Sequence, residues 1–320
     1  MNYYICIIMI YLKAIDIKQE FFVPINGGTE GEKPPNGLYI NVDNNYPNGE
    51  TVYKGSYKKV TVNKNITFPA GIKFGYSTIE NLQPFVDSLE TTTDYSYMFE
   101  SCKSLKKIRL NDTDSVLSFK YCFAQCTSLE SVGEINCASC TGAGAFFYGC
   151  RSLYDVNLIN TGNIVMANGC FNNTAIENLI LEDCHSLETA QNLVISNNLK
   201  VLKLYKTYKL RDLSFNGNRN LEEFFIEDAS KLDSNLNFSF LPNLKSAGSF
   251  KDYGKGFTGR RSFLLSKNGL SLEAIEQIIN DIATVTINGC SISISKSIYD
   301  QLPNEIKELA TSKNWTLRGQ

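Results

Sequence analysis

The sequence predicts a mainly β chain with some α-helix, in which short repeats stack into a solenoid between two distinct ends. Three observations carry this prediction. Apolar anchors recur every 22–24 residues within residues 79–250, and each anchor opens an alternating apolar pattern typical of a strand with one buried face. Neither pattern continues into residues 1–78 or 251–320. We therefore expect a small N-terminal β-rich attachment module, the repeat solenoid, and a linker with an α/β C-terminal cap.

The repeat is the strongest signal in the chain. Successive anchors are 24, 24, 23, 23, 22 and 23 residues apart, and further apolar residues follow each anchor at offsets near three and five. The anchors are Leu105, Leu129, Leu153, Ile176, Leu199, Leu221 and Leu244. A weaker copy of the pattern begins eleven residues after the later anchors, at Leu187, Leu210 and Leu232, and predicts a second short strand in those units. This period and pattern indicate a leucine-rich repeat, in which each unit covers the apolar flank of its neighbour.

The N-terminal region lacks the repeat. Its segment from Gly27 to Gly37 is rich in turn-forming residues and predicts a loop or linker, and strands are expected at Leu38–Val42 and between Lys58 and Phe68. The apolar stretch from Tyr3 to Leu12 is too short to span a membrane as a helix. It also lacks the preceding basic residue and the cleavage site of a signal peptide, so we interpret it as an ordered buried segment.

The C-terminal region changes to helical and then strand-like spacing. Apolar residues from Leu272 to Ile282 predict a helix with Ser271 as its N-cap. Two alternating runs flank Asn288-Gly289, which predicts a β-hairpin with its turn at that dipeptide. Pro303 is expected at the first position of a final helix, which the closing NWTL segment follows as a strand. Such a module would seal the last repeat.

Composition excludes several function classes. The chain has 31 Lys and Arg against 33 Asp and Glu, whereas binding to nucleic acid requires a basic surface. His185 is the only histidine, so metal sites with two histidines cannot form. It lies in a turn-like segment, and no Ser/His/Asp catalytic set can be assigned around it. We therefore expect no catalytic residues, no cofactor and no metal.

The ten cysteines have three interpretations. Cys122-x3-Cys126 with Cys137-x2-Cys140 has the residue types of a four-thiolate zinc site, and disulfides are a second alternative. The repeat favours a third, because Cys122 occupies the same slot as Met98 and Phe146, and Cys140 the same slot as Val116 and Ile164. Thiols pack as small apolar groups in protein cores. Core packing in a reducing compartment is therefore the favoured interpretation.

The first units resemble a known family. The segments MFESCKSLKKIRL from Met98, CFAQCTSLESV from Cys122 and FFYGCRSLYDVNLI from Phe146 are similar to the F-x-x-C-x-S-L-x-x-I-x-L unit of BspA-like leucine-rich repeat proteins. After Ile176 only the L-x-x-L-x-L half persists. The resemblance implies a repeat stack used for adhesion or protein binding, as in bacterial surface proteins and phage structural proteins. It implies no catalytic residue set.

These observations lead to a non-enzymatic recognition protein. Aromatic residues in repeat register form the candidate binding surface, namely Tyr205, Tyr208, Phe224 and Phe225. Because no export or anchor signal is evident, we expect a bacteriophage virion component such as a head fibre, tail or decoration protein, assembled in the host cytoplasm. The alternative is a bacterial cell-surface adhesin with an atypical export signal in residues 1–20. Expected partners are other virion or surface proteins and a host-surface protein or glycan, without nucleic acid or a membrane span; a homo-oligomer is a further possibility.

Overall fold

The computed structural model describes residues 21–22, 38–39, 41–43, 52–54, 75, 82–87, 91–248 and 250–320. The strands are β1 (Phe21–Phe22), β2 (Leu38–Tyr39), β3 (Asn41–Asp43), β4 (Val52–Lys54), β5 (Lys107–Ile108), β6 (Ser131–Asn136), β7 (Asp155–Ile159), β8 (Asn178–Leu181), β9 (Thr189–Ala190), β10 (Val201–Leu204), β11 (Asp212–Leu213), β12 (Glu223–Ile226), β13 (Leu236–Asn237), β14 (Ser262–Leu265), β15 (Cys290–Ile294) and β16 (Trp315–Gly319). The helices are α2 (Gln83–Val86), α3 (Leu272–Asp281), α4 (Lys296–Gln301) and α5 (Asn304–Ser312), with 3₁₀ turns η1 (Thr113–Ser115) and η2 (Thr161–Asn163).

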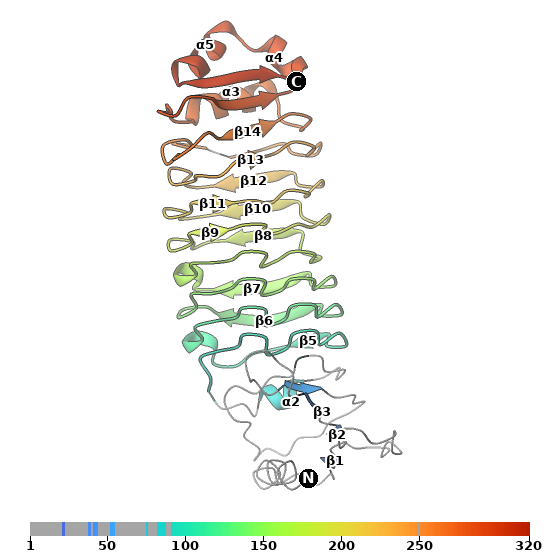
Figure 1. Ribbon diagram of the computed structural model, residues 1–320. Helices are drawn as coiled ribbons and strands as arrows, with labels where there is room; N and C mark the ends of the chain where they lie inside the picture. Colours follow the sequence, from blue (N-terminus) through green and yellow to red (C-terminus); the bar gives the residue numbers. More distant parts are fainter. Residues whose placement is uncertain are drawn as a thin grey trace.

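The described part of the chain is a mixed α/β fold with mostly parallel sheets, few helices and no closed barrel. Figure 1 shows the strands from β5 to β16 stacked along one long axis, with α3, α4 and α5 at the C-terminal end. The sheets of this stack have the strand orders β5-β6-β7, β8-β10-β12, β9-β11 and β13-β14-β15-β16. Every pairing within them is parallel, whereas the short β3 and β4 pair antiparallel.

The repeat spacing of the sequence reappears as strand register. Val201 pairs with Asn178 on one side and with Glu223 on the other, which are separations of 23 and 22 residues. Lys107 pairs with Ser131 at a separation of 24. The predicted second strands also form: β9 and β11 pair with each other, and β13 follows the third of the weaker anchors. Residues that share a repeat position are therefore neighbours in space.

Burial alternates along these strands as one buried face requires. In both β10 and β12 every second residue is buried, and the anchor leucines of all described units are buried as well. Phenylalanines stack from unit to unit beneath the first sheet, with ring centroids 5.0 Å apart for Phe99 and Phe123 and 5.6 Å apart for Phe147 and Phe171. The core is thus a continuous column shared by neighbouring units.

The position three residues before each anchor holds a buried hydrogen-bond donor in most units. The Sγ of Cys126 donates to the carbonyl of Phe99, and that of Cys150 to the carbonyl of Phe123, each over 3.0 Å. Ser196 and Asn218 occupy the same position in later units and also donate to backbone carbonyls. The position therefore requires a small side chain that fills space and satisfies a carbonyl, which Cys, Ser and Asn all provide.

The described cysteines are all buried and none forms a disulfide. Burial raises the pKa of their thiols where a shift is resolved, as for Cys137 and Cys170. Across the described residues, no group of three or more His, Cys, Asp or Glu is arranged to hold a metal ion. Cys137, whose repeat position also holds Thr113, points its Sγ toward the carbonyl of Ile135. These positions are those expected for core packing.

One strand departs from the repeat pattern. In β6 the residue at offset five from Leu129 is Glu134, which would place a carboxylate in the core. The register between β6 and β7 shifts by one residue between Ser131 and Glu134, so that Ile135 is buried and Glu134 is exposed. A Cβ on Gly133 would lie 3.0 Å from the Cγ of Arg109. A β-bulge at this glycine therefore restores the inward apolar face.

The C-terminal cap contains one element that the sequence pattern misassigned. The helix with its Ser271 N-cap is confirmed as α3, because the Ser271 hydroxyl accepts a bond from the Ala274 amide, and the closing strand is confirmed as β16. The predicted hairpin at Asn288-Gly289 is wrong. β15 instead pairs parallel with β14 and β16, and all five of its residues are buried. Burial on both faces favours a central parallel strand over a hairpin arm.

The N-terminal expectations lie mostly outside the described residues. The strand predicted at Leu38–Val42 overlaps β2 and β3, whereas the segments from Tyr3 to Leu12, from Gly27 to Gly37 and from Lys58 to Phe68 belong to parts that the structure does not describe. None of the helices in the described residues is long and apolar enough to traverse a membrane.

Candidate recognition surface

The outward positions of the β8-β10-β12 sheet carry the apolar residues of the candidate site. The inward positions of these strands are buried, so the residues between them face away from the core. We define the outer patch as Ile180, Val201, Tyr205 and Phe225. Ile180 is 46% exposed, and the other three are partly exposed. A cluster of apolar groups on the solvent side of a sheet is only partly removed from water by folding, which makes this surface a candidate for binding.

Strand register brings the outer patch together. Lys203 pairs with Ile180 on one side and Phe225 on the other, so these three side chains form one row across the sheet. The rings of Tyr205 and Phe225 have centroids 5.0 Å apart and are tilted by 40°. A Cβ on Gly248 would lie 3.0 Å from the Cα of Phe225 and 3.1 Å from its ring, so glycine leaves room for that residue. The ring of Phe225 is therefore held between Tyr205 and the backbone at Gly248.

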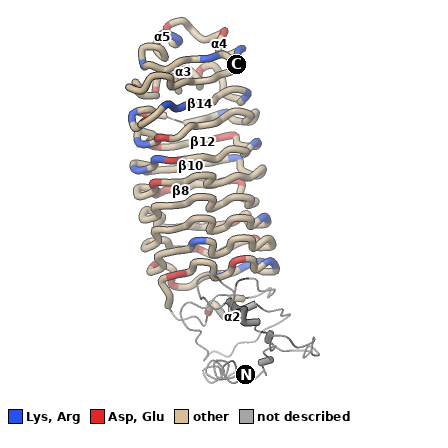
Figure 2. Tube along the Cα trace, in the orientation of Figure 1, with Lys and Arg blue, Asp and Glu red and all other residues tan. Residues whose placement is uncertain are grey.

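Charged side chains around the outer patch are already paired. The Nζ of Lys203 lies 2.8 Å from a carboxylate oxygen of Glu223. At the repeat position directly after the anchor, Lys200 forms an ion pair with Glu177 at 2.8 Å, and Lys245 forms one with Glu222 at 2.7 Å. Figure 2 shows acidic and basic residues distributed together over β8, β10 and β12. The surface therefore combines apolar side chains on both sides of the paired Lys203 with further ion pairs beside them.

The pKa shifts of three of these charged groups agree with the ion pairs. The hydrogen bond from Lys245 lowers the pKa of the exposed Glu222 carboxyl, and that from Lys200 to Glu177 raises the pKa of the lysine. The hydrogen bond to Glu223 likewise raises the pKa of Lys203. These shifts favour the charged forms of Glu222, Lys200 and Lys203. Because each is exposed, the pairs contribute little to stability and mainly fix the charge pattern of the surface.

The four residues expected at the binding surface have different locations. Tyr205 and Phe225 lie together in the outer patch, and Tyr208 is exposed on the turn that follows β10. Phe224 is 0% exposed and packs against Phe215 in the core, so its assignment to the surface is wrong. The reason is strand parity, since neighbouring residues of a strand point to opposite faces.

Two patch residues were missed from the sequence. Ile180 and Val201 are aliphatic and stand beside buried leucines, so they read as core residues. The available signal was alternation within the strand: Ile180 lies between Leu179 and Leu181, and Val201 directly precedes Leu202. Because neighbours of inward residues in a strand point to the other face, both residues face outward.

Other clusters singled out by residue type have structural partners. The Nδ1 of His185 lies 2.7 Å from the Asp183 carboxylate, and both are partly exposed at the surface. In the basic segment after residue 250, Arg261 is bound to Asp233, with 3.0 Å between the guanidinium and the carboxylate. Lys267 lies over the ring of Phe240.

Comparisons with known proteins place no relative beside this chain. No protein-family model matches it. No curated protein matches either. The same holds for solved structures.

Proposed function

We propose that the chain is a leucine-rich repeat solenoid of the BspA-like type and a non-enzymatic recognition protein that binds its partner through the outer patch. The proposal is supported by the 22–24-residue register of the parallel strands and by the row that joins Ile180, Lys203 and Phe225. Its single strongest support is the aromatic pair Tyr205 and Phe225 on the solvent side of a sheet. Aromatic residues at the centre of an apolar patch are frequent binding hot spots.

A protein partner fits this surface better than a glycan. The Phe225 ring packs between Tyr205 and Gly248, so it offers an edge and part of a face instead of a flat platform for a sugar ring. The framing charges are neutralised within the chain by the Lys203–Glu223 and Lys200–Glu177 pairs. An apolar centre inside a polar rim is the usual anatomy of a protein–protein interface. We expect binding that depends weakly on salt.

We place this recognition protein in a bacteriophage particle, as a head fibre, tail or decoration protein that the N-terminal residues 1–78 attach to the virion. The proposal is supported by the resemblance of the first units to repeats found in phage structural proteins and by the burial of every described thiol. Mass spectrometry of purified virions should detect the chain with its N-terminal segment retained. The alternative, a bacterial cell-surface adhesin, predicts instead that the chain is found on cells and that N-terminal sequencing finds the apolar segment removed.

The binding role is tested by variants of the outer patch. Ile180→Asp and Phe225→Ala should weaken adsorption of the labelled protein to host cells or to particles that lack it by at least about tenfold, the loss expected for a hot-spot residue. Leu117→Asp is the matched control, because Leu117 is 52% exposed and therefore comparable with Ile180, but lies outside the patch. Circular dichroism should show each variant folded. Equal adsorption of all three variants and the parent protein would remove the outer patch as the binding surface.

A further inference from the structure

The stack is interrupted on one side between its third and fourth units. β7 closes the β5-β6-β7 sheet and β8 opens the β8-β10-β12 sheet, although the anchors of these units are separated by the usual 23 residues. In the described residues no backbone hydrogen bond joins β7 to β8. The two sheets therefore meet without the ladder that joins every other pair of neighbouring strands within them.

The two halves nevertheless stay connected around this boundary. The Ala175 amide donates to the Leu153 carbonyl just before the strands, over 2.9 Å, and the Ser186 amide donates to Gly162 just after them, over 3.1 Å. On the second strand row, Met166 pairs with Thr189 in the same parallel register as its neighbours. At this boundary, strand pairing is missing only on the side that carries β7 and β8, which we call the sheet side. On the opposite side, which carries Met166 and Thr189, pairing is continuous across the boundary.

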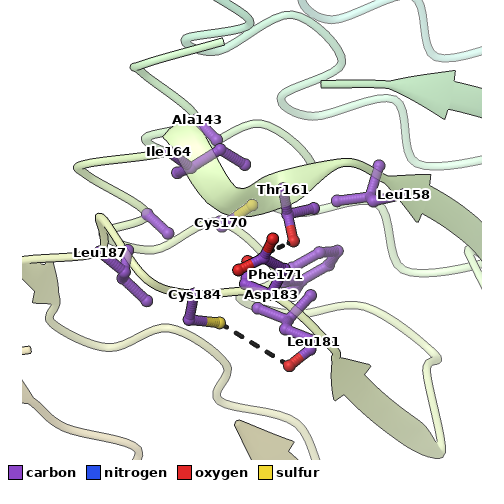
Figure 3. Close-up of a pocket in the computed structure, with 11 residues that line it drawn as sticks. Ala143, Leu158, Thr161, Ile164, Cys170, Phe171, Leu181, Asp183, Cys184 and Leu187 are labelled. Atoms are coloured by element: carbon purple, nitrogen blue, oxygen red, sulfur yellow. Dashed lines mark hydrogen bonds between the residues drawn. The ribbon is translucent and has the colours of Figure 1, made fainter. Parts of the chain in front are cut away.

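The core is more exposed at this boundary than within the β8-β10-β12 sheet. Val156 and Leu158 occupy inward positions of β7 but are only partly buried, whereas their counterparts Leu202 and Leu204 in β10 are 0% exposed. Beside Leu158 lies a mainly apolar cavity of about 20 Å³. Figure 3 shows Leu158, Phe171 and Leu181 around this space. Imperfect packing leaves a void of this kind, which costs stability.

A side-chain wedge lies at the corner after β7, where the chain makes the 3₁₀ turn η2 as it makes η1 after β5. The His185 ring lies directly against η2, since a Cβ on Gly162 would lie 2.3 Å from its Cε1. The Thr161 hydroxyl donates to the Asp183 carbonyl over 2.6 Å and ties the two corners together. The third and fourth units therefore meet at this corner through the close contact of the His185 ring with Gly162.

We propose that the β7–β8 boundary is a joint at which the two halves of the stack open and close on the sheet side. The continuous row through Met166 and Thr189 is the axis. Closing pairs β7 with β8 and covers Val156 and Leu158; opening exposes them further. The joint changes the angle between the β5-β6-β7 sheet and the outer patch, and it does not depend on the proposed binding function.

Distance distributions on the outer face test the joint. Genetically encoded spin labels at Ser131 and Asn178 span the boundary, and labels at Lys107 and Asp155 span the same number of strands within one sheet. Two strand spacings separate each pair by about 10 Å, which suits dipolar broadening in continuous-wave EPR. The gap between the sheets already lengthens the mean distance across the boundary, so the width of the distribution is the test of motion. We expect a broader distribution for the pair across the boundary than for the pair within one sheet. Equal widths would overturn the proposal, and this comparison needs no destabilised variant.

Two substitutions at the wedge sharpen the test. Gly162→Ala places a Cβ against the His185 ring and should shift the cross-boundary distance further, while leaving the Lys107–Asp155 pair unchanged. Adding His185→Ala to that variant removes the ring and should reverse most of the shift. A Gly162→Ala variant that alters both distances equally, or neither, would contradict the assignment of the wedge.

Discussion

Phe224 and Phe225 are neighbours in β12 with opposite environments, and replacing each with alanine tests the strand parity on which the surface depends. Phe224 is 0% exposed, and its ring centroid lies 4.8 Å from that of Phe215 and 5.1 Å from that of Phe238. Removing a buried phenylalanine costs about 3–5 kcal/mol. Phe225 contacts Tyr205 and Gly248 from the solvent side, so its removal should cost about 1 kcal/mol.

The assay is urea unfolding followed by circular dichroism and by tyrosine fluorescence. Because the midpoint scales with stability at constant slope, Phe224→Ala should lower it by about 1 M or more, and Phe225→Ala by a small fraction of that. Agreement between the two probes shows that the transition is cooperative enough for the comparison. Adsorption should show the opposite order: the folded Phe225→Ala variant should lose more binding than the folded fraction of Phe224→Ala. Equal losses of stability, or a larger loss for Phe225→Ala, would refute the orientation of β12.

Further predictions concern the two ends of the stack and its thiols. The Lys313 ammonium donates hydrogen bonds to the carbonyls of Ile279, Asn280 and Ile282 at the end of α3. Lys313→Met should therefore lower the free energy of unfolding by about 2 kcal/mol, measured by thermal unfolding. A melting temperature equal to that of the parent protein would show that these bonds are dispensable. The Gln83 side-chain amide forms two hydrogen bonds with the backbone of Arg109, next to the outer edge of β5. Gln83→Ala should expose this edge and promote association, which light scattering detects. A variant that stays as monomeric as the parent protein would show that Gln83 does not protect the edge. Burial raises the pKa of Cys184 from 9.0 to about 12, so the unfolded thiol ionises first. The contribution of Cys184 to stability should be constant below pH 9 and fall by about 1.4 kcal/mol per pH unit up to about pH 12. Urea unfolding as a function of pH should therefore show a smaller slope for Cys184→Ala than for the parent protein, and an equal slope would contradict this.

The repeat could be predicted from the sequence because each unit needs apolar residues at the same inward positions. The anchors and their inward neighbours, such as Leu202 and Leu204, alternate with polar residues at a fixed period, and that period became the strand register. The second row of strands followed from the same reasoning applied to Leu187 and Leu210. Burial patterns of this kind are local and therefore visible in one sequence.

Features that depend on neighbouring units were less visible. The bulge at Gly133 arises because Glu134 cannot enter a core that the adjoining strands define. The Asn288-Gly289 dipeptide has the local chemistry of a hairpin, yet the segment after it is the buried centre of a parallel sheet. The boundary between β7 and β8 is a break in strand pairing between two units, which the 23-residue spacing of their anchors does not reveal.

Zero-length cross-linking with a carbodiimide tests the central claim, that residues 22 or 23 apart lie side by side along the stack. The reagent joins an amine to a carboxylate only when the two are in contact, and mass spectrometry identifies the joined peptides. The account predicts the links Glu177–Lys200 and Glu222–Lys245, whose residues are 23 apart and whose ion pairs measure 2.8 Å and 2.7 Å. Links from these lysines to acidic residues at other repeat positions would contradict the register, and with it the stacked architecture and the outer patch.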